Sequence, residues 1–475
     1  MKKIFKGKKV VVMGLGLHGG GAGVAKFFAK QGAKVLVTDL KTKDQLAKSI
    51  QKLRGLKIEF VLGHHRAQDF ENADLIIKNP AVPVNSFFLT IARDSKVKIA
   101  TDIDIFFDLC KAPIVGVTGT KGKSTVATLI YEILKRKCKD AILAGNIGVS
   151  PLEFLDKIKK RSYAVLELSS FELENIKKSP AIAVITSIFP DHLDRYASFK
   201  EYIKSKEKIF LFQRKSDYLV LNYDNPEARS YAKDAPSKVY YFSNSDASKE
   251  LDSSKMFGCF IRNGMIFFDK EEAPILKINE TKLKGEHNAS NILAAMSVAK
   301  LLRVPDKIIK KAIRSFKGVP SRQEFVAEIN GVKYFNDTTA TMPEATIAAI
   351  KTFKENYPKA RLILIGGGQN KNLNYKELAG VIIKNIQEFV LLPGTASDLI
   401  KREMELRKSK INISSAKSME DAVRQAAAAA KPGDIVLLSP AAASFNLFKN
   451  EFDRGEQFIK AVKDLKYGEQ KILPS

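Results

Sequence analysis

The residues best suited to do chemistry lie in a glycine-rich segment that follows an apolar run. Residues 118–125 read Thr-Gly-Thr-Lys-Gly-Lys-Ser-Thr, directly after the apolar run 112–117. Glycines let backbone N–H groups turn toward phosphate oxygens, and the start of the following helix adds partial positive charge. Lys123 can reach the β- and γ-phosphates, and the Ser124 hydroxyl can ligate Mg²⁺. The residues predicted to bind ATP here are Gly119, Thr120, Lys121, Gly122, Lys123, Ser124 and Thr125.

Two further polar positions follow apolar runs that have the pattern of strands. Glu167 lies at the end of the run 163–168, and His192 lies between two aspartates after the run 181–188. A carboxylate that leaves a strand beside a phosphate loop is well placed to hold Mg²⁺, which prefers oxygen ligands. We therefore predict that Glu167 is a metal ligand and that His192 is functional. The alternatives are a surface glutamate and a histidine that caps a loop.

The elements that must position these residues divide the chain into three α/β segments. A chain of 475 residues is long enough for two or three domains. Strand patterns alternate with helix patterns throughout, which is typical of parallel sheets. We expect three domains, at residues 1–102, 103–317 and 318–475. The predicted folds are a Rossmann-like first domain, a P-loop ATPase-type central parallel sheet with a small extra sheet over about residues 217–284, and a Rossmann-like third domain.

Composition and charge indicate a globular protein rather than a membrane-spanning or disulfide-rich one. Hydrophobic residues make up 45% of the chain and charged residues 28%, as in globular proteins, and no apolar run approaches the roughly 18 residues of a membrane span. Three widely spaced cysteines make neither a disulfide framework nor a metal cluster, which favours the reducing cytoplasm. The net charge of +27 is interpreted as a lysine-rich surface, because no nucleic-acid-binding motif accompanies it.

The main prediction is an ATP-dependent enzyme that acts on small molecules. Two other functions are remote alternatives. Gly14, Gly16 and Gly19, followed by Asp39, satisfy a dinucleotide-binding fingerprint, so an NAD-dependent oxidoreductase is one alternative. That fingerprint is weak by itself, and a dehydrogenase leaves the phosphate loop and Glu167 unexplained. A basic P-loop ATPase stimulated by nucleic acid is the other alternative, and its activity would fall steeply with salt.

Together with the phosphate loop, the segments 167–171 and 191–194 resemble motifs of the Mur ligase family, which also includes the folylpolyglutamate synthases. Residues 285–291, Gly-Glu-His-Asn-Ala-Ser-Asn, are similar to the motif with which the family contacts adenine. Residues 321–324 and 336–337 resemble its phosphate-contacting arginine and nucleotide-contacting aspartate. The resemblance implies further ATP contacts from Asn288, Asn291, Arg322 and Asp337.

The resemblance also implies a mechanism. Members of the family use ATP to turn a carboxylate into an acyl phosphate, which an amine then attacks. The implied catalytic residues are Lys123, His192, Lys206 and Arg322, and the implied ligands of two Mg²⁺ ions are Ser124, Glu167, His192 and Lys206. The family carbamylates a lysine four residues beyond a tyrosine, which matches Tyr202 and Lys206, with Lys204 and Lys208 nearby as alternatives.

Within the family the chain is most similar to the members that add D-glutamate. This implies UDP-N-acetylmuramoyl-L-alanine and D-glutamate as partners of a monomeric cytoplasmic enzyme in peptidoglycan precursor synthesis, with no nucleic acid and no membrane insertion. The implied contacts of the UDP-sugar are Gly16, Leu17, His18, Asp39, Leu40, Asn79 and Asn146. Those of D-glutamate are Thr341, Lys371, Ser444, Phe445 and Phe452. A sister ligase that adds another amino acid and a folylpolyglutamate synthase-like enzyme are the close alternatives.

The sequence departs from the family pattern at a few positions. Thr339 stands where many members have a lysine, and His18 replaces a hydroxyl-bearing residue of the uridine loop. Asn79-Pro80-Ala81 replaces a Ser-Pro-Gly turn, and Phe452 is shifted by one position. Because the ATP loop and the implied glutamate site lie in different domains, we expect the third domain to rotate about residues 316–318.

Overall fold

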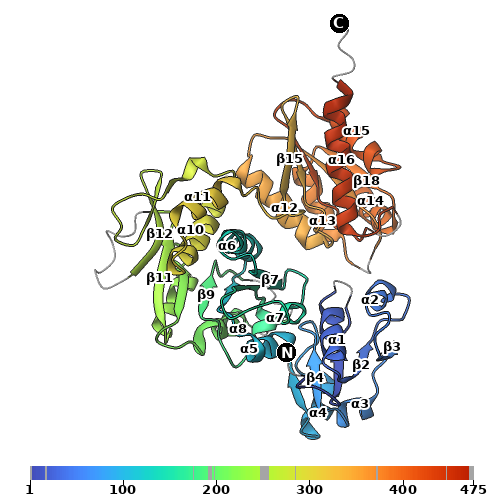
Figure 1. Ribbon diagram of the computed structural model, residues 1–475. Coiled ribbons are helices and arrows are strands. Elements are labelled where there is room, and N and C mark those ends of the chain that lie inside the picture. Colours follow the sequence, from blue (N-terminus) through green and yellow to red (C-terminus); the bar gives the residue numbers. More distant parts are fainter. Residues whose placement is uncertain are drawn as a thin grey trace. The chain divides into compact units, whose positions relative to one another are not determined.

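The computed structural model describes most of the chain, and its helices and strands build three sheets. The described residues are 3–16, 19–174, 176–190, 195–196, 198–245, 256–283, 285–370, 373–444 and 447–469. They form two compact units, Met1–Phe316 and Lys317–Ser475 (Figure 1). The α/β class predicted from the sequence is confirmed. The boundary between the units falls at the segment where we expect a hinge, and the rotation itself stays a prediction.

The first sheet has five parallel strands in the order β3-β2-β1-β4-β5. Its strands are β1 (Lys9–Met13), β2 (Lys34–Asp39), β3 (Ile58–Leu62), β4 (Leu75–Lys78) and β5 (Lys98–Ala100). Its helices are α1 (Gly20–Lys30), α2 (Ala47–Gln51), α3 (Ala67–Glu71) and α4 (Phe87–Asp94), and α5 (Asp102–Leu109) leads out of it. The valine run of β1 is buried on both faces, since Val12 packs with Phe28 of α1 while Val11 packs with Phe70 of α3.

The second sheet has nine strands in the order β14-β13-β12-β11-β10-β9-β6-β8-β7. They are β6 (Ile114–Thr118), β7 (Ile142–Gly145), β8 (Ala164–Glu167), β9 (Ile182–Ile185), β10 (Tyr218–Asn222), β11 (Lys238–Ser243), β12 (Met256–Arg262), β13 (Met265–Phe268) and β14 (Leu276–Lys277). The sheet is parallel up to β12, and β13 and β14 are antiparallel. The small extra sheet expected near residues 217–284 is instead the edge of this sheet, because β12 pairs directly with β11.

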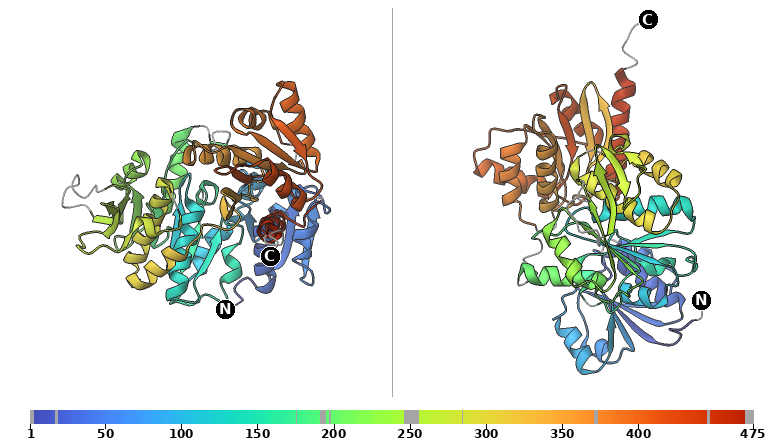
Figure 2. Two further views of the ribbon diagram at one scale, coloured as in Figure 1. Left: turned by 90° about the horizontal axis from the view of Figure 1, so that it is seen from above. Right: turned by 90° about the vertical axis from the view of Figure 1, so that its left-hand side faces the viewer.

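Helices cover both faces of the central sheet (Figure 2). They are α6 (Lys123–Lys137), η1 (Pro151–Phe154), α7 (Ser170–Leu173), α8 (Phe199–Leu211), α9 (Pro226–Ser230), η2 (Tyr231–Lys233), η4 (Ile278–Glu280), α10 (Glu286–Leu301) and α11 (Asp306–Ser315). Val117 packs on the face that carries α6 and α10, whereas Leu166 packs in the cluster that contains Ile209 of α8. Two covered faces explain why the strands are almost wholly apolar.

The second unit contains a six-stranded sheet in the order β15-β16-β20-β17-β18-β19, in which only β15 is antiparallel. Its strands are β15 (Glu324–Ile329), β16 (Val332–Asn336), β17 (Leu362–Gly367), β18 (Glu388–Leu392), β19 (Asn412–Ser415) and β20 (Ile435–Leu438). Its helices are α12 (Pro343–Asn356), α13 (Lys376–Asn385), α14 (Thr395–Leu406), α15 (Met419–Ala429) and α16 (Glu451–Glu469). Helices α12 to α14 cover one face, and α15 and α16 the other.

Among the described residues, no helix has both the length and the apolar character needed to cross a bilayer.

The turn between β1 and α1 brings backbone unusually close to backbone. A Cβ atom on Gly21 would lie 2.4 Å from the carbonyl oxygen of Leu15 and 2.5 Å from that of Gly14. A Cβ atom on the neighbouring Gly20 would meet no described residue within 4 Å. Position 21 therefore has room only for glycine, whereas the same first turn of α1 tolerates a methyl group one residue earlier.

We predict that Gly21→Ala lowers the free energy of unfolding of the first unit by about 1–3 kcal/mol, because the backbone must move to admit the methyl group. Gly20→Ala is the matched control and should be neutral or slightly stabilising, since alanine favours helix. Urea unfolding of the full-length variants measures both. Equal stability of the two variants would contradict the close approach at Gly21.

Candidate functional site

The loop between β6 and α6 is shaped by two glycines with positive φ angles, 147° at Gly119 and 88° at Gly122. A Cβ atom on Gly119 would lie 2.0 Å from Thr186 Oγ1, and one on Gly122 would lie 2.4 Å from Asn291 Oδ1. The loop therefore passes closely between the segment after β9 and the first turns of α10. A residue with a side chain fits at neither position without displacing these neighbours.

Lys123 and the start of α6 bring positive charge to the loop. Lys123 Nζ donates to the carbonyl oxygens of Gly119 and Thr120, at 3.0 Å each, so the ammonium group lies over the loop. Gly122 at the helix N-cap makes no side-chain cap hydrogen bond, and the start of α6 adds the partial positive charge of a helix N-terminus to the loop. The Ser124 side chain lies at this helix start and is largely buried. The arrangement fits the phosphates of a nucleotide.

Lys206 is buried against this loop. Its Nζ atom donates to Gly119 O at 3.0 Å and lies 3.4 Å from Thr118 Oγ1, with 1% of the residue exposed. It also lies 4.8 Å from the centroid of the Tyr202 ring, and the Tyr202 hydroxyl is 3.0 Å from Thr120 Oγ1. Helix α8 points both residues inward because they are four positions apart.

The neighbouring lysines of α8 point elsewhere. Lys204 is exposed, and Lys208 donates to the backbone oxygen of Glu174. Of the three lysines that the sequence leaves open for carbamylation, Lys206 is therefore the one that contacts the phosphate loop.

Glu167 ends β8 beside the phosphate loop, since it pairs in register with Val117 of β6. Only 1% of it is exposed. Oε1 accepts a hydrogen bond from Asn146 Nδ2 at 2.9 Å, while Oε2 is buried with no hydrogen-bond partner among the described residues. A buried carboxylate oxygen without a donor is costly unless a cation meets it. The buried Oε2 atom of Glu167 therefore fits a cation such as Mg²⁺.

Five residues predicted from the sequence lie outside the described part of the chain. They are Leu17, His18, His192, Lys371 and Phe445. Within the described residues, no group of three or more His, Cys, Asp or Glu side chains could hold a metal. The second metal site therefore stays a prediction.

The first sheet brings together predicted UDP-sugar residues from three neighbouring strands. Asp39 at the end of β2 accepts hydrogen bonds from the N–H groups of Leu15 (2.9 Å) and Gly16 (3.1 Å). Its second oxygen accepts from Lys41 N at 2.9 Å. One carboxylate oxygen thus fixes the glycine-rich turn and the other fixes the segment after β2, which differs from the ribose-binding role in a dinucleotide site. Leu40 beside it is 67% exposed.

Asn79, after β4, supports the same turn from the other side. Its Nδ2 atom lies 3.4 Å from Gly14 O, and its Oδ1 atom accepts from Ala81 N at 3.0 Å. Ser49, which the sequence did not single out, donates to Gly16 O at 2.7 Å. Asn146 lies apart from this group, on the central sheet, where its amide holds Glu167.

The predicted adenine motif lies against the phosphate loop. Asn291, largely buried in α10, is the residue that a side chain on Gly122 would meet. Its Nδ2 atom is 3.4 Å from Asn288 Oδ1. The structure therefore brings Asn288 and Asn291 to the same place as the loop, although more than 150 residues separate them in sequence.

In the second unit, Asp337 follows β16 and connects two other loops. Its carboxylate accepts from Gln323 N at 3.2 Å and from Ser439 Oγ at 2.9 Å. Burial raises the pKa of Asp337 to about 7, and the Ser439 hydroxyl partly opposes this rise. Thr339 donates to Ser321 O at 2.9 Å, which holds the turn containing Arg322 against the same loop.

The described residues of the predicted D-glutamate site lie on loops that are joined to one another. Thr341 follows β16 and Ser444 follows β20, and these strands are neighbours in the sheet. Ala441 N donates to Ala340 O at 2.8 Å, which connects the two loops. Phe452 belongs to a different element, α16, and is 55% exposed.

Arg454 of α16 is a residue whose role sequence reasoning missed. It is fully buried, and burial lowers the pKa of its guanidinium to about 10. It donates to Thr338 Oγ1 (3.0 Å), Thr338 O (2.8 Å) and Ala442 O (3.1 Å). A guanidinium thus clamps the loops after β16 and β20. The adjacent Gly455 was the available signal, since a Cβ there would lie 2.6 Å from Thr338.

Glu172 is a second residue that the sequence did not indicate. It closes a capping box on α7, where its carboxylate accepts from Ser169 N at 2.7 Å and from Ser169 Oγ at 2.9 Å. Burial, together with nearby Asp102 and Glu167, raises its pKa to about 8, and the hydrogen bonds from Ser169 partly oppose this rise. The side chain is therefore held protonated near neutral pH.

We predict that Glu172→Gln stabilises the protein increasingly as pH rises. The folded-state pKa of about 8 lies above the ordinary value of 4.5, so wild type loses stability as pH rises between these values. Glutamine accepts the same hydrogen bonds and stays neutral. Urea unfolding at pH 8 should favour the variant by about 1 kcal/mol or more, with a smaller difference at pH 5.

Glu71→Gln removes an exposed carboxylate and controls for the loss of charge alone. The same difference at both pH values, or an equal gain from Glu71→Gln, would contradict the raised pKa of Glu172.

Comparisons with known proteins agree along the whole chain. Three family models match in order: Mur ligase MurD-like, N-terminal domain at residues 8–101, Mur ligase middle domain at 117–299, and Mur ligase, glutamate ligase domain at 321–442. A protein of Roseiflexus sp. strain RS-1, named UDP-N-acetylmuramoylalanine--D-glutamate ligase, is 43% identical over 465 residues, which cover 96% of this chain and 98% of that one. A protein of the same name from Thermoanaerobacter sp. strain X514 is 36% identical over 97% of this chain and 99% of its own length.

Solved structures share the fold. The UDP-N-acetylmuramate-alanine ligase MurC from Thermotoga maritima matches with a TM-score of 0.56 at 18% identity, over 96% of this chain and 100% of that one. A murein peptide ligase from Psychrobacter arcticus matches with a TM-score of 0.51 at 15% identity, over 99% of this chain and all of that one. At these identities the likeness concerns architecture alone.

Proposed function

This chain belongs to the Mur ligase family, and we propose that it is an ATP-dependent ligase that adds D-glutamate to UDP-N-acetylmuramoyl-L-alanine. One observation carries the chemistry. A buried lysine, a buried carboxylate oxygen that has no donor in the described part of the chain, and a phosphate loop meet at the carboxyl ends of β6 and β8. The proposed substrates are those named for the relatives, because these proteins match this chain over nearly its full length.

The three parts of the chain divide the work in this proposal. Residues 1–102 bind the UDP-linked substrate, residues 103–317 bind ATP, and residues 318–475 bind D-glutamate. The enzyme acts as a monomer in the cytoplasm, where ATP and UDP-linked precursors are available. Arg322 and Asp337 contact the nucleotide, and Thr341, Lys371, Ser444, Phe445 and Phe452 contact D-glutamate.

The reaction begins with a carboxylate, which is a poor acyl donor at neutral pH. An oxygen of the L-alanyl carboxylate attacks the γ-phosphorus of ATP, ADP leaves, and an acyl phosphate forms. Positive charge at the loop stabilises the transferring phosphoryl group, and Lys123 and Arg322 supply part of it. Ser124, Glu167, His192 and carbamylated Lys206 would hold Mg²⁺, which would supply the rest of this positive charge.

The second step forms the amide bond. The neutral amine of D-glutamate attacks the acyl carbon, a tetrahedral intermediate forms, inorganic phosphate leaves and the amine loses a proton. The protein contributes mainly by positioning the two substrates and excluding water. Arg454 and Asp337 support this step indirectly, because they hold the loops that carry Thr341 and Ser444.

We predict that purified protein releases phosphate from ATP with Mg²⁺ and UDP-N-acetylmuramoyl-L-alanine only when D-glutamate is added. Lys123→Ala should lower kcat by about 100-fold or more, because it removes a preorganised charge at the phosphate loop. Amino acids tested singly define the specificity. A preference for another amino acid would reassign the enzyme to a sister ligase, and unchanged turnover of Lys123→Ala would overturn the role of the loop.

We predict that Lys206 carries the carbamate. Protein equilibrated with ¹³C-bicarbonate should show a carbamate carbon signal in NMR spectra, and Lys206→Ala should lose that signal together with most activity. Lys204→Ala is the matched control on the same helix, and its exposed side chain predicts that signal and activity are kept. A signal that survives Lys206→Ala would place the carbamate elsewhere.

A further inference from the structure

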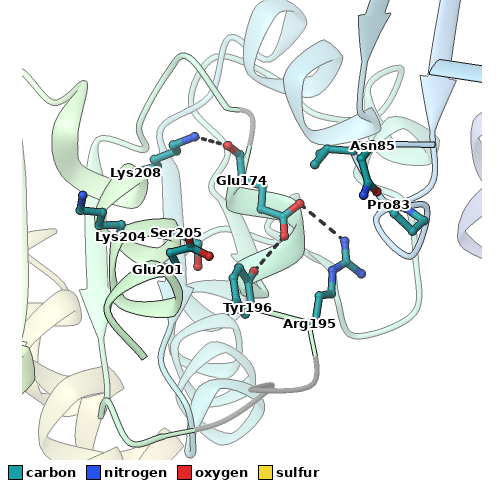
Figure 3. A pocket seen from close by; sticks show the side chains of 10 residues that line it. Pro83, Asn85, Glu174, Arg195, Tyr196, Glu201, Lys204, Ser205 and Lys208 are labelled. Atoms are coloured by element: carbon teal, nitrogen blue, oxygen red, sulfur yellow. Dashed lines mark hydrogen bonds and ion pairs between the residues drawn. The ribbon is translucent and has the colours of Figure 1, made fainter. Parts of the chain in front are cut away.

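A cavity of 440 Å³ lies in the first unit, between the segment after β4 and the helices that follow β8 and β9 (Figure 3). It is lined by Pro83, Val84, Asn85, Glu174, Arg195, Tyr196, Glu201, Lys204, Ser205 and Lys208. The proposed mechanism uses none of these residues. Their contacts nevertheless run from the turn that carries Asn79 to the helix that carries Lys206.

Arg195 is the residue that spans the two sides. Its Nη2 atom donates to the carbonyl oxygen of Pro80 at 3.1 Å and lies 3.5 Å from Glu174 Oε2. The centre of the guanidinium is 3.8 Å from the centroid of the Phe171 ring. One planar cation therefore stacks on an aromatic ring, pairs with a carboxylate and holds a backbone oxygen of the first sheet. Figure 3 shows its ion pair with Glu174.

Glu174 is itself fixed, so it can anchor the guanidinium. Oε1 accepts a hydrogen bond from the Tyr196 hydroxyl at 2.9 Å, and the backbone oxygen accepts one from Lys208 (Figure 3). The Glu174 side chain is only 14% exposed, which strengthens its interaction with Arg195 relative to a surface pair.

On the side of the first sheet, the turn that Arg195 holds is part of the proposed UDP-sugar site. Pro80 follows Asn79, whose amide contacts Gly14 of the glycine-rich turn. Buried Lys78 donates to Val82 O at 3.2 Å, and this hydrogen bond also holds the turn. A displacement of Pro80 would therefore move Asn79 and, through it, the glycine-rich turn.

On the side of the central sheet, the contacts continue to the phosphate loop. The Tyr196 ring packs edge-on against the Tyr202 ring, with centroids 5.5 Å apart. The Tyr202 hydroxyl is 3.0 Å from Thr120 Oγ1, and Lys206 Nζ lies over the Tyr202 ring. Because Arg195 and Tyr196 are adjacent in the chain, movement of one is passed to the other.

We propose that Arg195 is a positioning residue that couples binding of the UDP-sugar at the turn after β4 to binding of ATP at the phosphate loop. The inference rests on the proposed function, since the two ligands are those of the ligase. Each ligand prefers the arrangement in which the Arg195 contacts are complete, so the first to bind prepares the site for the second.

The three contacts require the shape of arginine as well as its charge. A guanidinium is planar, donates in several directions and stacks on aromatic rings, whereas a lysine ammonium is a compact point charge. Arg195→Lys should therefore keep the positive charge and lose the coupling. Lys204→Ala removes a positive charge from the same cavity without touching these contacts, which makes it the matched control.

The test measures the affinity for UDP-N-acetylmuramoyl-L-alanine by calorimetry, with and without a saturating non-hydrolysable ATP analogue and Mg²⁺. We expect the analogue to tighten binding to wild type and to Lys204→Ala by about fivefold or more, and to Arg195→Ala and Arg195→Lys by less than about twofold. The affinity of each arginine variant for the analogue alone should stay near that of wild type. A merely structural defect would weaken that affinity as well.

Wild-type coupling in both arginine variants, absence of coupling in wild type, or equal loss in Lys204→Ala would overturn the inference. D-glutamate-dependent phosphate release by wild type is assayed separately. An active wild type with unaltered coupling in Arg195→Ala refutes only the role of Arg195, whereas a wild type without that activity refutes the proposed function.

Discussion

The site depends on the Lys206 side chain, which is buried against the backbone of a glycine loop and carries an ammonium group before carbamylation. Taking a cation out of water costs several kcal/mol unless hydrogen bonds and nearby polar groups replace the lost hydration. Lys206 recovers part of that cost from Gly119 O and the face of Tyr202. The same contacts fix the loop in which the two glycines make room for Thr186 and Asn291. The shape of the glycine loop and the position of the Lys206 side chain therefore depend on each other.

Charged side chains in this protein commonly hold backbone rather than face a ligand. Asp39 uses both carboxylate oxygens on three backbone N–H groups, and Arg454 binds carbonyl oxygens of two loops. The hydrogen bonds of these charged groups are strong because the groups are buried and their donors and acceptors are well aligned. In these two places, a buried charge therefore sets the positions of the backbone groups around it.

The sequence predicted the parts of the site whose signals are local. The phosphate loop, Glu167 at a strand end and the α/β alternation follow from spacing and periodicity, so these elements could be placed without a structure. The roles of Arg195 and Arg454 could not, because their partners Pro80 and Ala442 are chosen by tertiary packing. The capping box of Ser169 and Glu172 is local, but the burial that raises the pKa of Glu172 also comes from tertiary packing. The same reason explains β12 to β14. The sequence indicates short strands there, but neither segment alone shows that β12 pairs with β11 and so joins these strands to the central sheet.

The way in which the central sheet ends has a consequence for the behaviour of the protein at high concentration. A nine-stranded sheet could offer long rows of unpaired N–H and C=O groups to other chains and so seed aggregation. Here one edge is β14, two residues long, and the other is β7, which spans four residues and folds back at Val149 onto Gly145. Both edge strands are too short to template a strand from another chain, which disfavours aggregation through this sheet.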